Sequence, residues 1–236
     1  MQSITKLVCY LYFENYSFFL LSGKQVVPSI DLVFVINAAS SDSDNTFTRM
    51  KSVMGNIVDK YGIDRIHYGV VLYGERPSIQ LRFQHRTMTE NQLKRIIVSL
   101  PKPSGAPLLD RALKEAMMLL NSSARPDAKK IVLVITDKGS ANTKDELEKS
   151  SLALEQNGIR IVALTIGGEA DVEELENVVN RPSDIINTQG HEKPDSIATK
   201  IITVVTKGTI LFIATDVDIS FKRTRNNYKL ITTTNI

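Results

Sequence analysis

Four short and nearly continuous runs of apolar residues stand out along the chain. They are rich in Val and Ile, and polar residues or glycine bound each of them, at 30–36, 67–73, 130–136 and 158–167. Strands that are buried on both faces have this pattern, because helices cover both sides of a parallel sheet. We therefore predict four parallel strands at the centre of one sheet.

Segments with helical periodicity lie between and after these runs. In the first, Phe47, Met50, Met54 and Ile57 recur at steps of three and four residues, with charged residues between them. Apolar residues at this spacing form one stripe along a helix that packs on a core. The same spacing predicts helices through 109–120, 147–156 and 197–205.

The helix predicted at 147–156 has the least regular stripe, and its apolar face is assigned to Leu147, Leu152 and Ala153. Residues 143–146 (TKDE) resemble a capping box, in which a Thr and a Glu three residues later satisfy the first backbone N–H groups. Gly158 suits the end of the helix, since glycine tolerates the left-handed conformation found there.

The order of strands and helices predicts the fold class. Strands that alternate with helices form a doubly wound, mostly parallel sheet with helices on both faces. The run 79–83 instead alternates apolar and polar residues and follows a tight turn at 74–77, so we predict a hairpin and one antiparallel edge strand. The fold class is α/β.

Composition and charge narrow the function. Hydrophobic residues make up 42% and charged residues 23% of the 236 residues, as in globular proteins. The net charge of +3 comes from the segment after residue 216, where four cations face one anion, so the rest of the chain is neutral. A neutral domain argues against nucleic-acid binding, which needs a clustered basic face. No apolar stretch reaches the roughly 18 residues of a membrane span.

The two ends differ from the rest of the chain. Residues 1–28 contain two apolar segments that Glu14 and Asn15 interrupt, so they are a secretory leader with a defective core or an added strand. Residues 29–207 form the predicted domain, and 208–236 form a strand-like tail with a basic end. Cys9 is the only cysteine, which excludes an internal disulfide and a cysteine-based zinc site.

Polar loops follow the predicted strands where ligands bind in such sheets, at the carboxyl ends. These loops are 37–41 and 137–140, and 103–108 precedes a helix. We expect the three loops to meet in space.

At these loops the chain resembles a known family, the von Willebrand factor A domain. The matching segments are 31–36 (DLVFVI), 105–113 (GAPLLDRAL), 132–137 (VLVITD) and 158–167 (GIRIVALTIG), and the resemblance covers about residues 29–207. It implies a Rossmann-like sheet and a protein-binding function in adhesion.

The resemblance also implies a metal-ion-dependent adhesion site, with the pattern Asp-x-Ser-x-Ser, then Thr, then Asp. Matched position by position, these residues are Asn37, Ala39, Ser41, Ala106 and Asp137. Two oxygen-bearing side chains are replaced by methyl groups and one carboxylate by an amide. Mg²⁺ needs six oxygen ligands in near-octahedral geometry, so we expect a degenerate site and no cofactor.

The alternative to a degenerate site is a remodelled Mg²⁺ site, because two further carboxylates lie in the first loop. Asp42 and Asp44 could supply oxygen ligands in a remodelled Mg²⁺ site.

We therefore predict a secreted, non-enzymatic adhesion module of the extracellular-matrix type that binds a protein ligand without metal. The predicted contact rim is formed by loop residues at the top of the sheet: Asn37, Ser40, Ser41, Ser104, Gly105 and Asp137. The alternative is a cytoplasmic scaffold domain in a multiprotein complex. Ligand identity and oligomeric state are not encoded in any motif.

Other candidate chemistry is weak. The sequence contains no nucleophile elbow, phosphate loop or dinucleotide fingerprint, so the motifs of a hydrolase or a nucleotide-dependent enzyme are missing. His67, His85 and His191 do not share ligand spacing. Asn121 and Asn15 begin glycosylation triplets, which matter if the protein is secreted.

Overall fold

The computed structural model describes residues 8–9, 20–21, 23–26, 29–37, 44–83, 88–102, 104–167, 170–188, 192–206, 211–214, 217–224 and 227–234. The chain divides into two units, one made of residues 29–207 and the other of residues 1–28 with 208–236.

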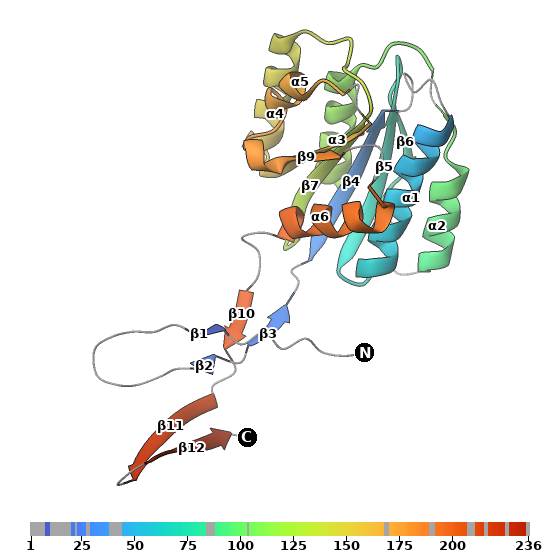
Figure 1. The fold of residues 1–236 in the computed structure, drawn as a ribbon. Helices are drawn as coiled ribbons and strands as arrows, with labels where there is room; N and C mark the ends of the chain where they lie inside the picture. Colours follow the sequence, from blue (N-terminus) through green and yellow to red (C-terminus); the bar gives the residue numbers. More distant parts are fainter. Residues whose placement is uncertain are drawn as a thin grey trace. The chain divides into compact units, whose positions relative to one another are not determined.

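The larger unit is built on one six-stranded sheet (Figure 1). Its order is β6 (Ser78–Leu81), β5 (Ile66–Tyr73), β4 (Ile30–Asn37), β7 (Lys129–Thr136), β8 (Ile159–Ile166) and β9 (Ile185–Thr188). All neighbours are parallel except β6, which runs antiparallel to β5. The predicted α/β class and the antiparallel edge strand are confirmed.

Helices cover both faces of this sheet. α1 (Asp44–Tyr61), α2 (Glu90–Ser99) and α6 (Pro194–Thr206) pack on one face, and α3 (Leu109–Ser123), α4 (Lys144–Gln156) and α5 (Val172–Glu176) on the other. A short 3₁₀ helix, Pro182–Asp184, precedes β9.

Burial on both faces explains the continuous apolar runs. In β4, Leu32, Phe34 and Ile36 pack in the core with α1 and α6, while Val33 and Val35 pack with α3 and α4. Successive side chains of a strand point to opposite faces, so a strand between two helical layers needs apolar residues throughout.

Four elements depart from the prediction. α2, α5 and β9 were not predicted, and the buried face of α4 differs from the one assigned. Leu147 and Leu154 are buried, with Ser150 and Ser151 beside them, whereas Leu152 is 53% exposed. The assignment of Leu152 to the core was wrong because the stripe follows 147, 150, 151 and 154, and two of those positions are serines.

Buried ion pairs lie at the edge of the sheet where β4 and β8 begin. Arg125 donates from Nε to Asp31 Oδ1 at 2.9 Å, and His67 Nδ1 lies 3.8 Å from the same oxygen. Arg160 forms two hydrogen bonds to Asp184, of 2.9 and 2.6 Å. A buried carboxylate needs such partners, so Asp31 and Asp184 have structural roles. His85 and His191 lie outside the described residues.

The smaller unit consists of three antiparallel strand pairs. β1 (Val8–Cys9) pairs with β2 (Leu20–Leu21), β3 (Gly23–Val26) with β10 (Leu211–Ala214), and β11 (Val217–Thr224) with β12 (Asn227–Thr234). The segments before and after the larger unit therefore pair with each other through β3 and β10. Among the described residues, no helix combines the length and apolar character needed to cross a membrane.

Candidate functional site

The candidate site lies at the edge of the sheet where the parallel strands end. Asn37 is the last residue of β4 and is paired in register with Tyr73, the last residue of β5. Thr136 ends β7, and Asp137 follows it directly. Parallel strands that end together bring their following loops to one edge, which is where ligands bind in folds of this class.

A buried polar network connects these three strand ends. The Asn37 side chain is inaccessible to solvent, and its Nδ2 donates to Thr136 Oγ1 at 3.2 Å. Thr136 Oγ1 in turn donates to the carbonyl oxygen of Lys138 at 2.5 Å and hydrogen-bonds with the fully buried Tyr73. Burial raises the pKa of Tyr73 well above its ordinary range against the effect of the Thr136 hydrogen bond, and the charges of Glu174 and Asp137 add to the increase.

The loop after β7 is held by a glutamate from α5. Glu174 Oε2 accepts a hydrogen bond from the backbone N–H of Ser140 at 2.7 Å. A Cβ on Gly139 would lie 3.0 Å from the same oxygen, so glycine allows this close approach. Burial raises the pKa of Glu174, although the hydrogen bonds from Ser140 oppose the shift. The carboxylate orders the loop at residues 138–140.

The loop before α3 packs against the turn after β5. Glu75 N–H donates to the Ser104 carbonyl at 3.2 Å, and Leu108 N–H donates to the Gly74 carbonyl at 3.1 Å. Gly105 has φ of +84°, and a Cβ there would lie 2.7 Å from the Cβ of Glu75. Only glycine fits this position without strain, because the backbone is left-handed and the space is occupied.

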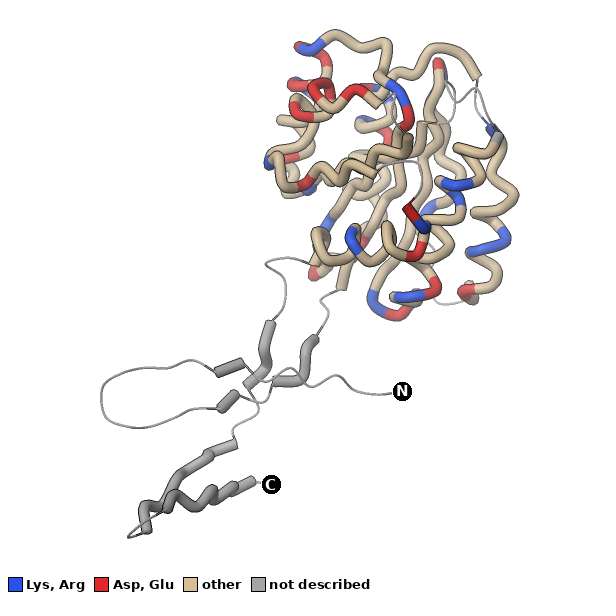
Figure 2. Tube along the Cα trace, in the orientation of Figure 1, with Lys and Arg blue, Asp and Glu red and all other residues tan. Residues whose placement is uncertain are grey.

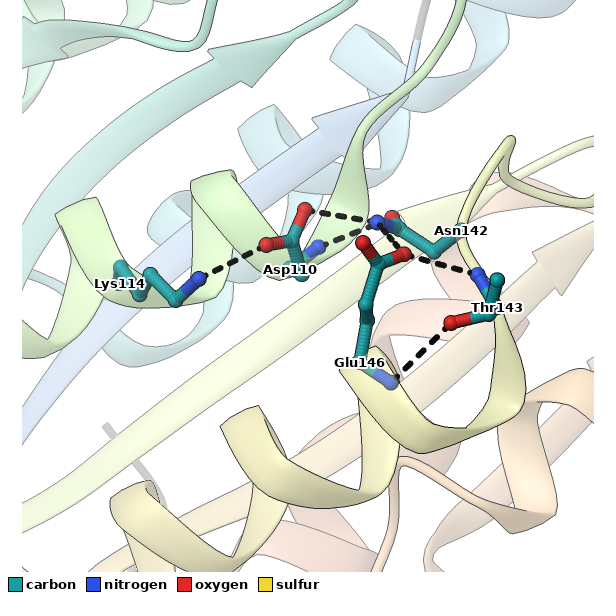
Figure 3. A network of polar contacts seen from close by, with 5 residues as sticks. All are labelled: Asp110, Lys114, Asn142, Thr143 and Glu146. Carbon is teal, nitrogen blue, oxygen red and sulfur yellow. Dashed lines mark hydrogen bonds and ion pairs between the residues drawn. The ribbon is translucent and has the colours of Figure 1, made fainter.

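Asn142 joins the loop after β7 to the start of α3 (Figure 3). Its Nδ2 donates to Asp110 Oδ1 at 2.7 Å and to Glu146 Oε2 at 3.1 Å, and its Oδ1 accepts from the Asp110 N–H at 3.1 Å. Lys114 completes the network with a bond of 2.8 Å to Asp110.

The network sets the charge state of Asp110 and begins α4. Burial raises the pKa of Asp110, but hydrogen bonds from Lys114 and Asn142 outweigh burial and hold the pKa below its ordinary value. Glu146 and Thr143 form the predicted capping box, which is confirmed. The beginnings of α3 and α4 are thus fastened to each other.

The structure places the predicted rim residues at two depths. Ser104 and Gly105 are exposed, whereas Asn37 and Asp137 are buried, with 0% and 6% of their surface accessible. Ser40 and Ser41 lie outside the described residues. Among the described positions, 104–106 are exposed, and Asn37 and Asp137 are buried.

The described residues do not fit a magnesium ion. At the five matched positions, Ala106 offers a methyl group, Asn37 an amide whose nitrogen is bonded to Thr136, and Asp137 one carboxylate. Ala39, Ser41 and Asp42 lie outside the described residues, and Asp44 is the first residue of α1. Within the described part of the chain no group of three or more His, Cys, Asp or Glu residues could hold a metal.

Four residues that hold the site together were not singled out in the sequence: Tyr73, Thr136, Asn142 and Glu174. Tyr73 and Thr136 could have been found as the polar ends of apolar strands. Asn142 directly precedes the capping box at 143–146, which is the one sequence signal beside it. No sequence pattern marks Glu174, because the contact of its side chain with the loop after β7 depends on where α5 packs.

Comparisons with known proteins agree on one family. The family model of the von Willebrand factor type A domain matches residues 31–204. The mouse collagen alpha-4(VI) chain is 26% identical over 161 residues, which cover 67% of this chain and 7% of the collagen. Cuticlin-6 of Caenorhabditis elegans is 23% identical over 172 residues, or 71% of this chain and 29% of cuticlin-6. The chain thus spans a minor part of each relative.

A solved structure has the same fold. Proximal thread matrix protein 1 from the mussel byssus, in a form with a zinc-occupied MIDAS motif, superposes with a TM-score of 0.67 at 18% identity. The match covers 77% of this chain and 49% of the mussel protein. At this identity the likeness extends to the fold alone.

Proposed function

Because the chain belongs to the von Willebrand factor type A domain family, we propose that it is a non-enzymatic protein-binding module of the extracellular-matrix type. It recognises a protein ligand through the loops at the top of the sheet and does so without a metal ion. Matrix relatives such as the collagen VI chain and cuticlin-6 support the setting.

The observation that carries the metal-free mechanism is the side-chain bonding of Asn37. A metal-binding carboxylate at this position would direct its oxygens to the ion. Asn37 instead uses its amide to bond Thr136 across two strands, and Ala106 offers no oxygen at all. The remaining ligands carry one formal negative charge at Asp137, which cannot compensate for the loss of hydration of a divalent cation.

Without metal, affinity has to come from shape and hydrogen bonding at a prearranged rim. The Glu174–Ser140 bond, the Asn142–Asp110 bonds and the Ser104–Glu75 bond hold the loops 104–108 and 138–142 in one conformation. Loops that are already ordered lose little conformational entropy when a ligand binds. The exposed surface at 104–106 is the described part of this rim.

The test uses the full chain and a panel of purified extracellular-matrix proteins, with binding measured by biolayer interferometry in EDTA and in Mg²⁺. We expect equal affinity in both buffers and a loss of about tenfold or more for Ser104→Arg, which places a large charged group on the rim. Asp127→Arg is the control, because Asp127 is exposed in the loop before β7, at the opposite edge of the sheet.

Two results would contradict the proposal. Binding that disappears in EDTA and returns with Mg²⁺ would establish a remodelled metal site in this chain. Equal losses for Ser104→Arg and Asp127→Arg would place the ligand elsewhere on the domain.

Secretion is tested separately at Asn121. Its side chain lies in the last turn of α3, is exposed, and donates to Asn157 Oδ1 at 3.0 Å. Mass spectrometry of the chain expressed in a secreting animal cell should find a glycan at Asn121. An unmodified chain that stays in the cytoplasm would favour the intracellular scaffold instead.

A further inference from the structure

The turn between α4 and β8 carries an asparagine that is followed directly by a glycine. Asn157 is the C-terminal cap of α4, and Gly158 precedes Ile159, the first residue of β8. Both residues of the turn are exposed. Asn157 is the only asparagine in the 236-residue sequence that has glycine as its next residue.

This pair holds the atoms for an intramolecular reaction. The backbone nitrogen of Gly158, once it has lost its proton, can attack the side-chain carbonyl carbon (Cγ) of Asn157. A bond forms between that nitrogen and Cγ, the bond from Cγ to Nδ2 breaks, and Nδ2 takes up a proton and leaves as ammonia. The product is a five-membered succinimide ring. Water then opens the ring at one of its two carbonyl groups and gives aspartate or isoaspartate.

Glycine makes the attacking nitrogen accessible. The residue has no side chain beside its own nitrogen, and its backbone turns more freely than that of any other residue. Gly158 has φ of +68°, and apart from its chain neighbours no atom lies within 4 Å of the point that a Cβ would occupy. Nothing around this position therefore shields the reacting amide from solvent.

In the folded turn, both reacting groups take part in hydrogen bonds. Asn157 Nδ2 donates to the Ala153 carbonyl at 2.8 Å, and Asn157 Oδ1 accepts from Asn121 Nδ2 at 3.0 Å. The Gly158 N–H donates to the Glu155 carbonyl at 2.8 Å. The reaction requires these bonds to open before the nitrogen can approach Cγ.

The opening that the reaction needs is confined to the end of the helix. Residues 155–158 are all exposed, whereas Leu154 before them and Ile159 after them are buried. The last turn of a helix opens at a much smaller free energy than the whole domain, because few buried contacts hold it. The turn can therefore reach the reactive conformation while the rest of the domain stays folded.

We propose that Asn157 is a deamidation site of the folded protein and that its modification loosens the junction between α4 and β8. Aspartate at this position has no amide to donate to the Ala153 carbonyl. Isoaspartate has a further effect, because its backbone passes through the side chain and gains a methylene group. The added length lies just before Ile159, which is buried and paired in register with Lys130 of β7.

The new charge also lies at an unfavourable place. The carbonyl end of a helix carries the negative end of its dipole, so an anion there is destabilising. The last turn of α4 has no basic residue, and Glu155 lies two positions before Asn157. α5, on the same face of the sheet, carries acidic residues and no basic one (Figure 2).

Peptide mapping by mass spectrometry tests the proposal on the full, folded chain after long incubation at body temperature. Conversion at Asn157 should exceed that at Asn91 and Asn180 by about tenfold or more, because glutamine and arginine follow these two exposed asparagines. It should be faster in mildly alkaline than in mildly acidic buffer, since the attacking nitrogen has to lose its proton.

Two variants relate the rate to the hydrogen bonds of the turn. Asn121→Ala removes the donor to Asn157 Oδ1, so the side chain opens more often and conversion should be severalfold faster. Met118→Ala is its matched control, because Met118 is exposed on the same helix one turn earlier. Asn157→Gln keeps an amide but would have to form a larger ring, so no conversion should occur at position 157.

The loosening is measured without incubation in Asn157→Asp, which contains the aspartate product from the start. Hydrogen–deuterium exchange over residues 155–159 should be severalfold faster than in wild type, because the Ala153 bond is lost and the helix end opens more often. Exchange at Leu119 and Leu120, which are buried in α3, should stay unchanged and shows that the variant is folded.

Three results would overturn the proposal. The first is conversion at Asn157 that is no faster than at Asn180, and the second is conversion that occurs only after the chain is unfolded in urea. The third is exchange in Asn157→Asp that equals wild type, which would remove the structural consequence. Ligand binding by the top loops is independent of this test, because the turn lies where β8 begins and those loops lie where the strands end.

Discussion

At the scale of single residues, the amide of Asn37 changes the chemistry of the site. An aspartate has no proton to donate to Thr136, and it would add a second carboxylate to the strand ends beside Asp137. The buried position therefore favours a neutral side chain. The neutral amide stabilises the strand ends without adding a second buried carboxylate beside Asp137.

We predict that Asn37→Asp lowers the free energy of unfolding by about 2–3 kcal/mol at neutral pH, through an uncompensated buried charge. The folded-state pKa of the new carboxyl should lie above its unfolded value of about 3.9. The folded variant then binds more protons than the unfolded chain between these two values, so the deficit is absent below about pH 4 and grows as the pH rises. Urea unfolding at several pH values measures it.

The control for this prediction is Asn91→Asp, which makes the same change at an exposed position in the first turn of α2. It should leave stability nearly unchanged or slightly higher, because an acidic residue suits the start of a helix. A deficit for Asn37→Asp that does not vary with pH would indicate lost packing or hydrogen bonding instead of buried charge.

At the scale of elements, the start of α3 depends on a residue that precedes α4. Asp110 is held by Asn142 and Lys114, and the balance of burial and hydrogen bonds keeps its pKa low. A depressed pKa contributes stability that is present above the unfolded value of about 3.9 and is lost as the pH falls through the folded value.

Asp110→Asn should therefore cost about 1 kcal/mol at pH 7, mainly by weakening the charge-assisted hydrogen bonds. The difference at pH 7 should shrink at a pH below the lowered folded pKa, where the wild-type carboxyl is protonated in both states. Urea unfolding at both pH values checks this, with Asp145→Asn in the first turn of α4 as a control, since Asp145 is exposed. A difference that is as large in acid as at pH 7 would contradict the electrostatic explanation.

Sequence patterns predicted the elements whose burial is uniform. β4, β5, β7 and β8 lie between two helical layers, so their composition alone identified them. β9 and α5 are short, four and five residues, and offer too few positions for a period to appear. The apolar pattern of α4 predicted the wrong buried face, because Ser150 and Ser151 are buried while Leu152 is exposed.

The candidate site was predictable only in part, for a related reason. Which loops meet follows from parallel strand order, so 104–108 and 137–140 were expected together. The bonds that hold the site join side chains 32 to 99 positions apart in the chain, as for Asn142 with Asp110 and Asn37 with Thr136. No local spacing records such contacts.

At the scale of the whole molecule, binding of a metal ion would be measurable as a change in the stability of the folded domain. A ligand that binds only the folded state stabilises it by about 2.7 kcal/mol at a concentration 100 times its dissociation constant. For a domain of this size that corresponds to a rise in Tm of several degrees, about 2–4 °C per kcal/mol. Because the described residues offer only Asp137 and the Asn37 amide, Mg²⁺ and Mn²⁺ should leave the wild-type Tm unchanged.

Rebuilding the oxygen ligands should reverse that behaviour. The triple variant Asn37→Asp, Ala39→Ser, Ala106→Thr restores two hydroxyls and one carboxylate beside Ser41 and Asp137, which are already present. In EDTA we expect it to melt below wild type, because two buried carboxylates then lie at the ends of neighbouring strands without a cation. In Mg²⁺ its Tm should rise by several degrees, since the cation neutralises both charges and binds only the folded state. Differential scanning calorimetry in EDTA and in Mg²⁺ measures both shifts on the same two proteins. A wild-type Tm that rises in Mg²⁺ would mean that carboxylates elsewhere in the first loop already complete a site, and the amide at position 37 would then be compatible with metal-dependent adhesion.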